Sequence, residues 1–222
     1  FNLANNHFSD QGERGILETR ENLDQLGFFY VGCRDKQVDD CSAKVIETAD
    51  LRVGMAGFSM VYGLFDIGLA TSSVAKLASS SDLVIVNIHW GVEYEHQSNR
   101  FQQNIPHELV DAGADIIVGH HPHVVQGIEV YKNRPIFYSL GNFMFDQYFS
   151  RDTQIGLGLG INFNKEELDI GLFPLSSLKS QPRLMGERDG EKELSNLIKW
   201  SSLDEVYVEQ VKTGKIIINF VK

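Results

Sequence analysis

The sequence predicts a layered α/β protein in which two packed sheets are flanked by helices. Strands and helices alternate up to about residue 123, and short strands without intervening helices then follow to about residue 175. Apolar residues make up 42% of the chain, which is enough for a full core, and 222 residues fit one domain. We therefore expect residues 1–222 to form a single domain.

The first half shows the alternation. Residues 1–4 resemble the end of a strand, and Asp10 with Glu13 forms a predicted capping box for a helix that stops near Gly27. The other elements expected here are strands at 28–31, 43–49, 51–58, 83–88 and 115–118, with helices at 72–79 and 101–112. Pro106 either weakens the middle of the last helix or marks its start.

The second half is predicted to be mostly β. Strands are expected at 124–131, 135–139, 142–146, 155–164, 167–175 and 215–221, with a helix at 191–201. The segment 178–193 is polar and contains Gly and Pro, which is typical of a surface loop.

Charge and cysteine content limit the classes of partner. The net charge of −10 argues against nucleic acid and weighs against a polyanion over a broad surface. No apolar run is long enough to cross a membrane. Cys33 and Cys41 bracket a polar loop, and a disulfide there would contribute roughly 2–3 kcal/mol and need an oxidising compartment. Two free thiols fit the sequence equally well.

The segment from Gly119 to His123 contains three of the seven histidines and directly follows a short apolar strand. Neutral imidazole is the commonest nitrogen ligand for transition metals, and the end of a strand is a usual place for a ligand loop. His121 and His123 are therefore candidate ligands, whereas an extended loop would turn His120 away from them. The alternative is a polar surface loop whose histidines are solvated.

Other polar groups follow the earlier strands. Asn6 and His7 come after the first strand, and His89 comes after the buried strand at 83–88. Ligand sites form at the carboxyl ends of strands in open α/β sheets, so these groups are expected to meet at one edge. Taken singly, each has a structural explanation as a turn former or a core histidine. His96 and His107 lie on polar segments and are expected to be solvated.

Longer segments resemble the CapA family, the bacterial capsule or poly-γ-glutamate synthesis proteins, which belong with the calcineurin-like metallophosphoesterases. The matching segments are Leu3-Ala-Asn-Asn-His7 with Asp10 and Gly12, His89-Trp-Gly-x-Glu93-Tyr94, Asp111-Ala-Gly-Ala-Asp115, Val118-Gly-His-His-Pro-His-Val-Val-Gln126 and Tyr138-Ser-Leu-Gly-Asn-Phe143. Residues 150–222 carry little of this signal. The resemblance implies a four-layer α/β/β/α sandwich with two divalent metals, of manganese, iron or zinc type.

The resemblance also implies roles for single residues. Asn6, His89 and His121 resemble ligands of the second metal, and His123 a ligand of the first. His7 resembles the catalytic group that donates a proton or hydrogen bond to a phosphate or leaving group. Three further residues are predicted to surround the ligands or contact the substrate: Glu93, Gln126 and Asn142.

One expected part of the site has no counterpart in the sequence. Related phosphoesterases use aspartates on earlier strands to bind the first metal and bridge the pair, and nothing precedes Phe1 here. Asp10, Asp66 and Asp115 do not lie at strand ends comparable to this motif. Asp146 does follow a predicted strand, which is its one similarity to the motif. We therefore expect an N-terminally incomplete fold that lacks its first strand, a half-site, and poor activity of this chain alone.

Three functions remain open. The first is a CapA-type protein of capsule or poly-γ-glutamate production, extracytoplasmic, anchored through an N-terminal segment and working with capsule-synthesis membrane proteins. The second is a metal-dependent phosphatase or phosphodiesterase acting on a small phosphate ester. The third is a non-enzymatic subunit that binds or assembles the polymer, against which the charge of −10 counts mildly because poly-γ-glutamate is anionic.

Overall fold

The computed structural model describes residues 1–62 and 65–220 and contains the predicted mixture of helices and two sheets. The chain divides into two compact units. The first comprises Phe1–Trp90 and Gln103–Val118, and the second comprises Gly91–Gln102 and Gly119–Lys222. The mixed α/β class is confirmed, and the four-layer stacking and single-domain organisation stay predictions.

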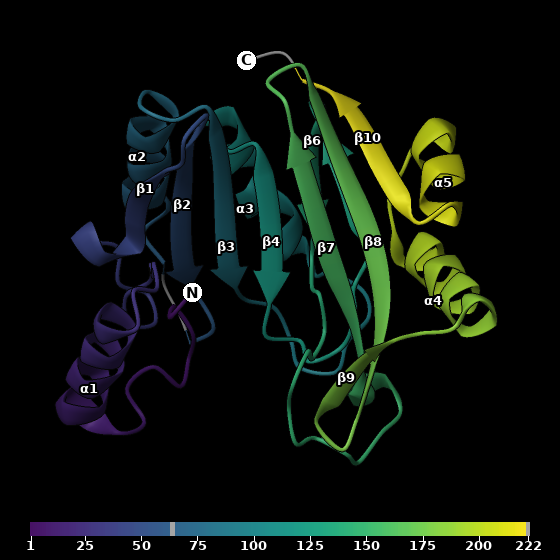
Figure 1. Cartoon of the computed structure of the whole chain (residues 1–222), viewed down its shortest axis with the longest axis horizontal. Helices are drawn as coiled ribbons and strands as arrows, with labels where there is room; N and C mark the ends of the chain where they lie inside the picture. Colours follow the sequence, from purple (N-terminus) through teal and green to yellow (C-terminus); the bar gives the residue numbers. More distant parts are fainter. Residues whose placement is uncertain (63–64, 221–222) are drawn as a thin grey trace. The chain divides into compact units, whose positions relative to one another are not determined.

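The first unit is built on a sheet with the strand order β1-β2-β3-β4 (Figure 1). Strand β1 (Ala43–Glu47) pairs with β2 (Arg52–Ser59) in the predicted hairpin, and β2 runs parallel to β3 (Leu83–His89). Strand β4 (Ile116–His120) starts beside β3, where the buried Asp115 carboxylate accepts a hydrogen bond from the backbone of Val84. The parallel register places Ser59 opposite His89, so both strands end at the same edge.

Helix α2 (Ile67–Ala78) packs against β1, β2 and β3. It buries Ala70, Val74 and Leu77, which repeat at helical spacing on one side. The helix begins five residues before the predicted start because Asp66 caps it through the backbone N–H of Leu69. Helix α3 (Arg100–Asp111) contributes its part from Gln103 onward to this unit and contains Pro106 in its interior.

The N-terminal elements differ from the prediction. The strands expected at 1–4 and 28–31 reduce to one parallel bridge between Asn2 and Val31. Helix α1 (Gly12–Gln25) has no side-chain cap, because Asp10 bonds to His7 and no capping box forms. The predicted stop is confirmed: Gly27 adopts φ +72°, and the backbone N–H groups of residues 27 and 28 bond back to the last turn.

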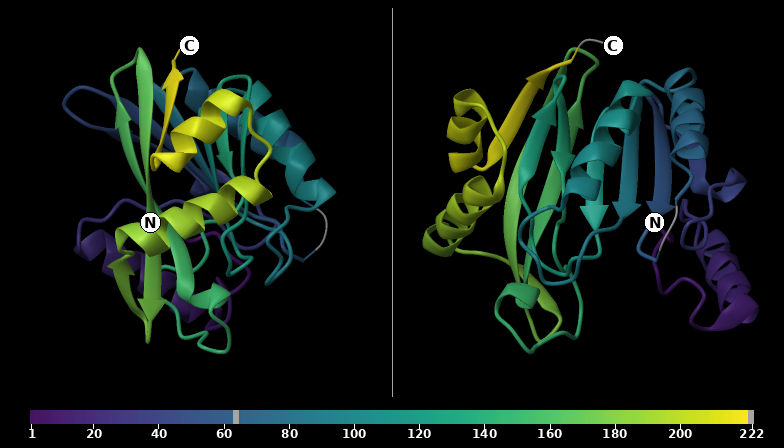
Figure 2. Two further views of the ribbon diagram at one scale, coloured as in Figure 1. Left: turned by 90° about the vertical axis from the view of Figure 1, so that its right-hand side faces the viewer. Right: turned by 180° about the vertical axis from the view of Figure 1, so that it is seen from behind.

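The second unit contains the end of β4, then β6 (Arg134–Phe137) and β5 (Ile128–Tyr131) in spatial order, and a separate four-stranded sheet. That sheet consists of β7 (Ile155–Phe163), β8 (Glu167–Leu178), β9 (Gln181–Leu184) and β10 (Lys215–Asn219). Helices α4 (Glu187–Trp200) and α5 (Glu205–Lys212) lie on one face of it (Figure 2). Between them they cover β8 and β10.

Several predictions for this unit were wrong. Residues 142–146 form no strand, and the predicted surface loop 178–193 contains β9 and the start of α4. Helix α5 was not predicted, because its eight residues are too few to show a clear period. The last strand, β10, ends at Asn219, and residue 221 of the predicted strand lies outside the described residues.

Cys33 and Cys41 form a disulfide with a Cα–Cα distance of 5.4 Å. This settles the alternative that the sequence left open. The bond closes a short loop in the first unit, and the sulfur of Cys33 is buried beside the hydroxyl of Ser42. The loop carries Asp35, whose carboxylate accepts hydrogen bonds from Ser59 Oγ and from the backbone N–H groups of Val61 and Tyr62.

Candidate functional site

In the first unit, His89 and Asn6 are in direct contact at the carboxyl end of β3. His89 Nε2 lies 2.8 Å from Asn6 Oδ1, and Asn6 Nδ2 donates to the Tyr62 hydroxyl at 3.0 Å. The bond to Tyr62 fixes the amide so that its oxygen faces the imidazole. Two ligands of one metal at about 2.0–2.2 Å also lie about 3 Å apart, so one ion could use this pair once it replaces the Nε2 proton that Asn6 Oδ1 accepts here.

His7 lies outside this contact. Its Nδ1 is 2.8 Å from Asp10 Oδ2, and both side chains are exposed. Asp10 is therefore used to orient His7 rather than to cap a helix. With a carboxylate accepting at Nδ1, the Nε2 atom of His7 is the one that can exchange a proton with a bound group.

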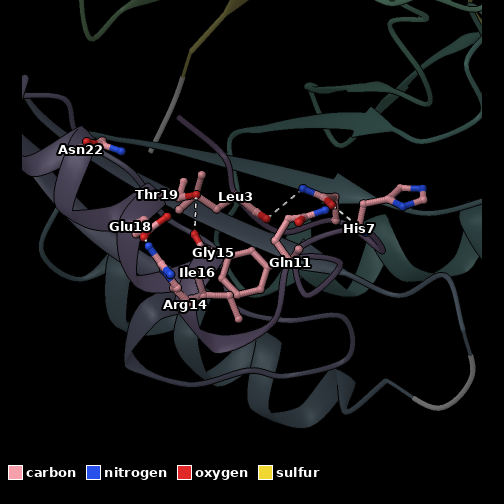
Figure 3. Close-up of a pocket in the computed structure, with 11 residues that line it drawn as sticks. Leu3, His7, Gln11, Arg14, Gly15, Ile16, Glu18, Thr19 and Asn22 are labelled. Atoms are coloured by element: carbon pink, nitrogen blue, oxygen red, sulfur yellow. Dashed lines mark hydrogen bonds and ion pairs between the residues drawn. The ribbon is translucent and has the colours of Figure 1, made fainter.

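A cavity of about 630 Å³ runs along α1, with His7 at one end of its lining and Asn22 at the other (Figure 3). Arg14 and Glu18 form an ion pair along its wall at 2.7 Å. None of the predicted metal ligands lines this cavity. It is therefore a surface groove beside the N-terminal helix and not the metal site.

In the second unit, Glu93, His121 and His123 come together. Their potential ligand atoms all lie within 4.8 Å of one another. Ligands of one metal at bonds of about 2.0–2.2 Å lie about 3–4 Å apart, so the three donors approach the spacing of a shared ion. Two neutral imidazoles and one carboxylate are a donor set that manganese, iron and zinc all accept. The residues present fit a divalent metal.

The backbone that presents these side chains is held in an uncommon conformation. Tyr94, His121 and His123 have φ values of 66°, 98° and 60°, in the left-handed region that residues other than glycine rarely adopt. A hydrogen bond of 2.8 Å from the N–H of Tyr94 to the carbonyl of Pro122 ties the two segments together. Strained backbone of this kind persists where the surrounding structure enforces it, and it is concentrated at functional sites.

Asn142 determines which nitrogen of His123 is available. Its amide nitrogen donates to the carbonyl of Thr153 at 2.9 Å and to Gln147 Oε1 at 3.3 Å, so its oxygen must face His123. His123 Nδ1 lies 2.9 Å from that oxygen. An amide oxygen only accepts hydrogen bonds, so Nδ1 carries the proton and Nε2 keeps its lone pair. Such a partner on the other ring nitrogen is usual for ligating histidines.

Gln126 holds the segment that carries Glu93. Its Nε2 donates to the carbonyl of Glu95 at 2.7 Å, and its Oε1 accepts from Gln102 Nε2 at 2.8 Å. The side chain is buried, and both ends of its amide form hydrogen bonds with other protein groups. Gln126 thus positions Glu93 indirectly, and its predicted contact with a substrate stays a prediction.

Two other histidines have defined surroundings. His96 is not simply solvated, because its Nδ1 bonds to the carbonyl of Val125 at 2.8 Å and its ring stacks on Trp200 at 4.0 Å. Burial lowers the pKa of His120 to about 4, so its imidazole is neutral at pH 7. Neither belongs to the group formed by Glu93, His121 and His123.

Sequence reasoning placed Glu93 around the predicted ligands, and the structure brings its carboxylate into one group with His121 and His123. The role of Glu93 stays a prediction. Reasoning from the residues also missed three exposed aromatic side chains. Tyr94 and Phe145 lie beside His123, and Phe149 packs against Tyr94. The signal that could have revealed Phe145 and Phe149 is the density of aromatic residues between 143 and 149.

The fold and this group define a mixed α/β protein with a candidate divalent-metal site. Residues 1–147 match the model of the bacterial capsule synthesis protein family PGA_cap, and the chain belongs to that family. The predicted family is therefore confirmed. None of the helices in residues 1–62 and 65–220 has the length and apolar character that a membrane crossing needs.

Two curated relatives are named as capsule or PGA biosynthesis proteins. The capsule biosynthesis protein CapA of Bacillus anthracis is 40% identical over 70% of this chain and 42% of its own length. The PGA biosynthesis protein CapA of Bacillus subtilis is 31% identical over 97% of this chain and 60% of its own length. The chain thus spans between two fifths and three fifths of these relatives.

Solved structures show a more distant likeness. A phosphatase from Mycoplasma pneumoniae gives a TM-score of 0.43 at 12% identity, covering 76% of this chain and 68% of that one. Vps29 from Entamoeba histolytica gives 0.36 at 13% identity, covering 76% of this chain and 74% of that one.

Proposed function

We propose that this chain is the metal-binding part of a CapA-type protein that acts in capsule or poly-γ-glutamate synthesis. The observation that carries the proposal is the group of three donor atoms from Glu93, His121 and His123. Family membership over residues 1–147, which include all three donors, supports the capsule context. The names of the Bacillus relatives support the same context.

The proposed ligands form one group in each unit. In the second unit Glu93, His121 and Nε2 of His123 hold a divalent metal, with Asn142 fixing the His123 ring. In the first unit Asn6 and His89 supply an oxygen and a nitrogen at contact distance. We propose two metals in the whole protein, of manganese, iron or zinc type.

The chemistry follows from the donors. A bound divalent ion supplies Lewis acidity and a source of hydroxide at neutral pH. His7, with Nδ1 oriented by Asp10, is proposed to hold or deliver a proton at Nε2. Asn142 and Gln126 orient the groups around the site and take no part in proton transfer.

Metal content is the deciding measurement. We expect elemental analysis of the purified chain to show bound metal that is lost in the His121→Ala/His123→Ala double variant. His107→Ala, a histidine outside the group, is the control and should keep the metal content of the wild type. Equal metal content in the wild type and the double variant would refute the proposed site.

A metal-dependent phosphatase or phosphodiesterase is the second candidate, because the same donor set serves phosphate-ester hydrolysis. Turnover of a small phosphate ester by the metal-loaded chain, lost in the double variant, would favour it. Metal binding without turnover, combined with saturable binding of poly-γ-glutamate, would favour a polymer-binding or assembly subunit.

The disulfide supports an extracytoplasmic location, because such bonds persist in oxidising compartments. We propose that the whole protein is held at the membrane and works with capsule-synthesis membrane proteins. Cell fractionation of the native protein, with a thiol-trapping assay of Cys33 and Cys41, tests this. Recovery in the cytoplasm with free thiols would contradict the proposal.

A further inference from the structure

Three aromatic side chains form an exposed surface in the second unit. Tyr94, Phe145 and Phe149, called the aromatic rim here, are 43%, 43% and 67% exposed. The rings of Tyr94 and Phe149 meet edge to face at 5.2 Å. Single exposed apolar residues are common, but a contiguous group of large ones marks an interaction site. We therefore expect a partner to bind at the rim and cover its rings.

The rim begins at the proposed metal ligands. The ring of Tyr94 stacks on His123 with centroids 6.1 Å apart, and the ring of Phe145 lies 5.0 Å from the same imidazole. A group bound to a metal at His123 would therefore have apolar ring faces next to it. Ligand sites that combine aromatic walls with a few polar groups or a metal are the usual design for small molecules.

Hydrogen bonds hold the rim in place although it lies on irregular backbone. Gln147 Nε2 donates to the Tyr94 hydroxyl at 3.2 Å. The hydroxyl of Ser180, in the turn between β8 and β9, donates to the carbonyl of Phe145 at 2.8 Å. A surface ordered in advance loses little entropy when a ligand covers it, which favours binding.

Charge indicates which kind of ligand fits. A divalent ion with two neutral imidazoles and the single carboxylate of Glu93 keeps a local charge of about +1, which attracts an anion. The rim next to it adds affinity for a ring or hydrocarbon group and none for a second negative charge.

We propose that the aromatic rim is the apolar subsite of this centre, and that its ligand is an anion with a planar or hydrocarbon group directly attached to its acidic head. The inference rests on the proposed metal site and adds the chemical class of the ligand. Because Tyr94 and Phe145 lie beside the proposed metal ligand His123, a small amphiphilic anion fits the rim better than a flat lipid surface or a second copy of the chain.

Two phosphonates, which are not hydrolysed as esters are, test the proposal. Phenylphosphonate and methylphosphonate present the same acidic head with and without a ring. We expect titration calorimetry on the zinc-loaded chain to show about ten-fold tighter binding of the phenyl compound. Phe145→Ala should reduce this preference to less than three-fold, because the Phe145 ring lies 5.0 Å from the His123 imidazole. The variant should bind zinc as the wild type does, because Phe145 is not one of the three ligands.

Phe173→Ala is the matched control, because Phe173 is 44% exposed on β8 and is not part of the rim. It should keep the ten-fold preference. Zinc binding with equal affinity for the two phosphonates would overturn the inference and leave the proposed function standing. Failure to bind zinc would overturn both.

A lipid surface is the competing occupant. Sedimentation with vesicles of phosphatidylcholine and phosphatidylglycerol tests it on the same variants. If Phe145→Ala abolishes vesicle binding and the wild type shows no preference between the phosphonates, the rim belongs to the membrane and the inference is overturned.

Discussion

Asn142 accepts a hydrogen bond of 2.9 Å from Nδ1 of His123, and its own amide is fixed by the backbone carbonyl of Thr153. One asparagine thus selects the tautomer of a proposed ligand. The consequence can be measured without any assay of function, because the tautomer is a property of the metal-free protein.

Asn142→Ala should weaken metal binding. Without the amide oxygen that accepts from Nδ1, the His123 ring can rotate and can adopt either tautomer. Loss of such a hydrogen-bond partner costs about 10–100-fold in metal affinity. Competition titration with a chelating dye measures the affinity, and nitrogen-15 NMR of the apo protein reads the tautomer. Asn162→Ala, at an exposed position on β7, is the control. Unchanged affinity with Nδ1 still protonated would show that Asn142 does not position His123.

Glu93→Gln should also weaken metal binding. The substitution keeps the size of the side chain and removes the only negative charge of the donor group, so we expect a loss of at least about ten-fold. Glu95→Gln changes an exposed carboxylate two residues away that contributes only its backbone carbonyl to Gln126, and it should bind metal normally. If the two variants bind metal equally well, Glu93 is not a ligand.

Gly156→Ala should disturb both stability and the site. A Cβ atom at residue 156 would lie 2.4 Å from the backbone oxygen of Asn142, so one of the two segments must move. We expect a loss of about 1–3 kcal/mol in the free energy of unfolding and weaker metal binding. Gly158→Ala, two residues along β7, would meet only an ordinary contact of 3.4 Å with Phe173. Denaturant unfolding of both variants measures the difference, and equal losses would contradict the steric argument.

Reduction of the Cys33–Cys41 bond should lower stability by about 2–3 kcal/mol, because the closed loop restricts the unfolded chain. Thermal unfolding with and without a phosphine reductant measures this. The Cys33→Ala/Cys41→Ala variant should unfold at the same temperature under both conditions. If the disulfide is shown to be fully reduced and the wild type still unfolds at the same temperature, the disulfide does not stabilise the fold.

Elements with a strong local signal were predicted well from the sequence. The buried strand at 83–88 appears as β3, and the hairpin of β1 and β2 turns where expected. The first segment is mostly apolar and the second contains turn residues, and both patterns act over a few neighbouring residues. The stop of α1 at Gly27 is equally local, because glycine readily adopts the left-handed conformation that ends a helix.

Elements were missed where local signals compete or where distant contacts decide the backbone. Asp10 has the sequence of a helix cap but bonds to His7, three residues before it, and α2 starts early because Asp66 caps it. The aromatic run at 143–145 resembles a strand, yet Phe143 and Phe145 are exposed in an irregular segment. A hydroxyl of Ser180, 35 residues away in the chain, helps to hold that segment.

The sequence by itself determined the family and the chemistry of the donors: imidazoles at the ends of apolar strands and an asparagine next to a histidine. Only the tertiary structure decided that the Glu93 carboxylate joins His121 and His123. Side-chain direction there depends on left-handed backbone at Tyr94 and both histidines, and on a hydrogen bond between two segments distant in sequence. These long-range constraints override local conformational preference, so the arrangement of the donors appears only in the folded chain.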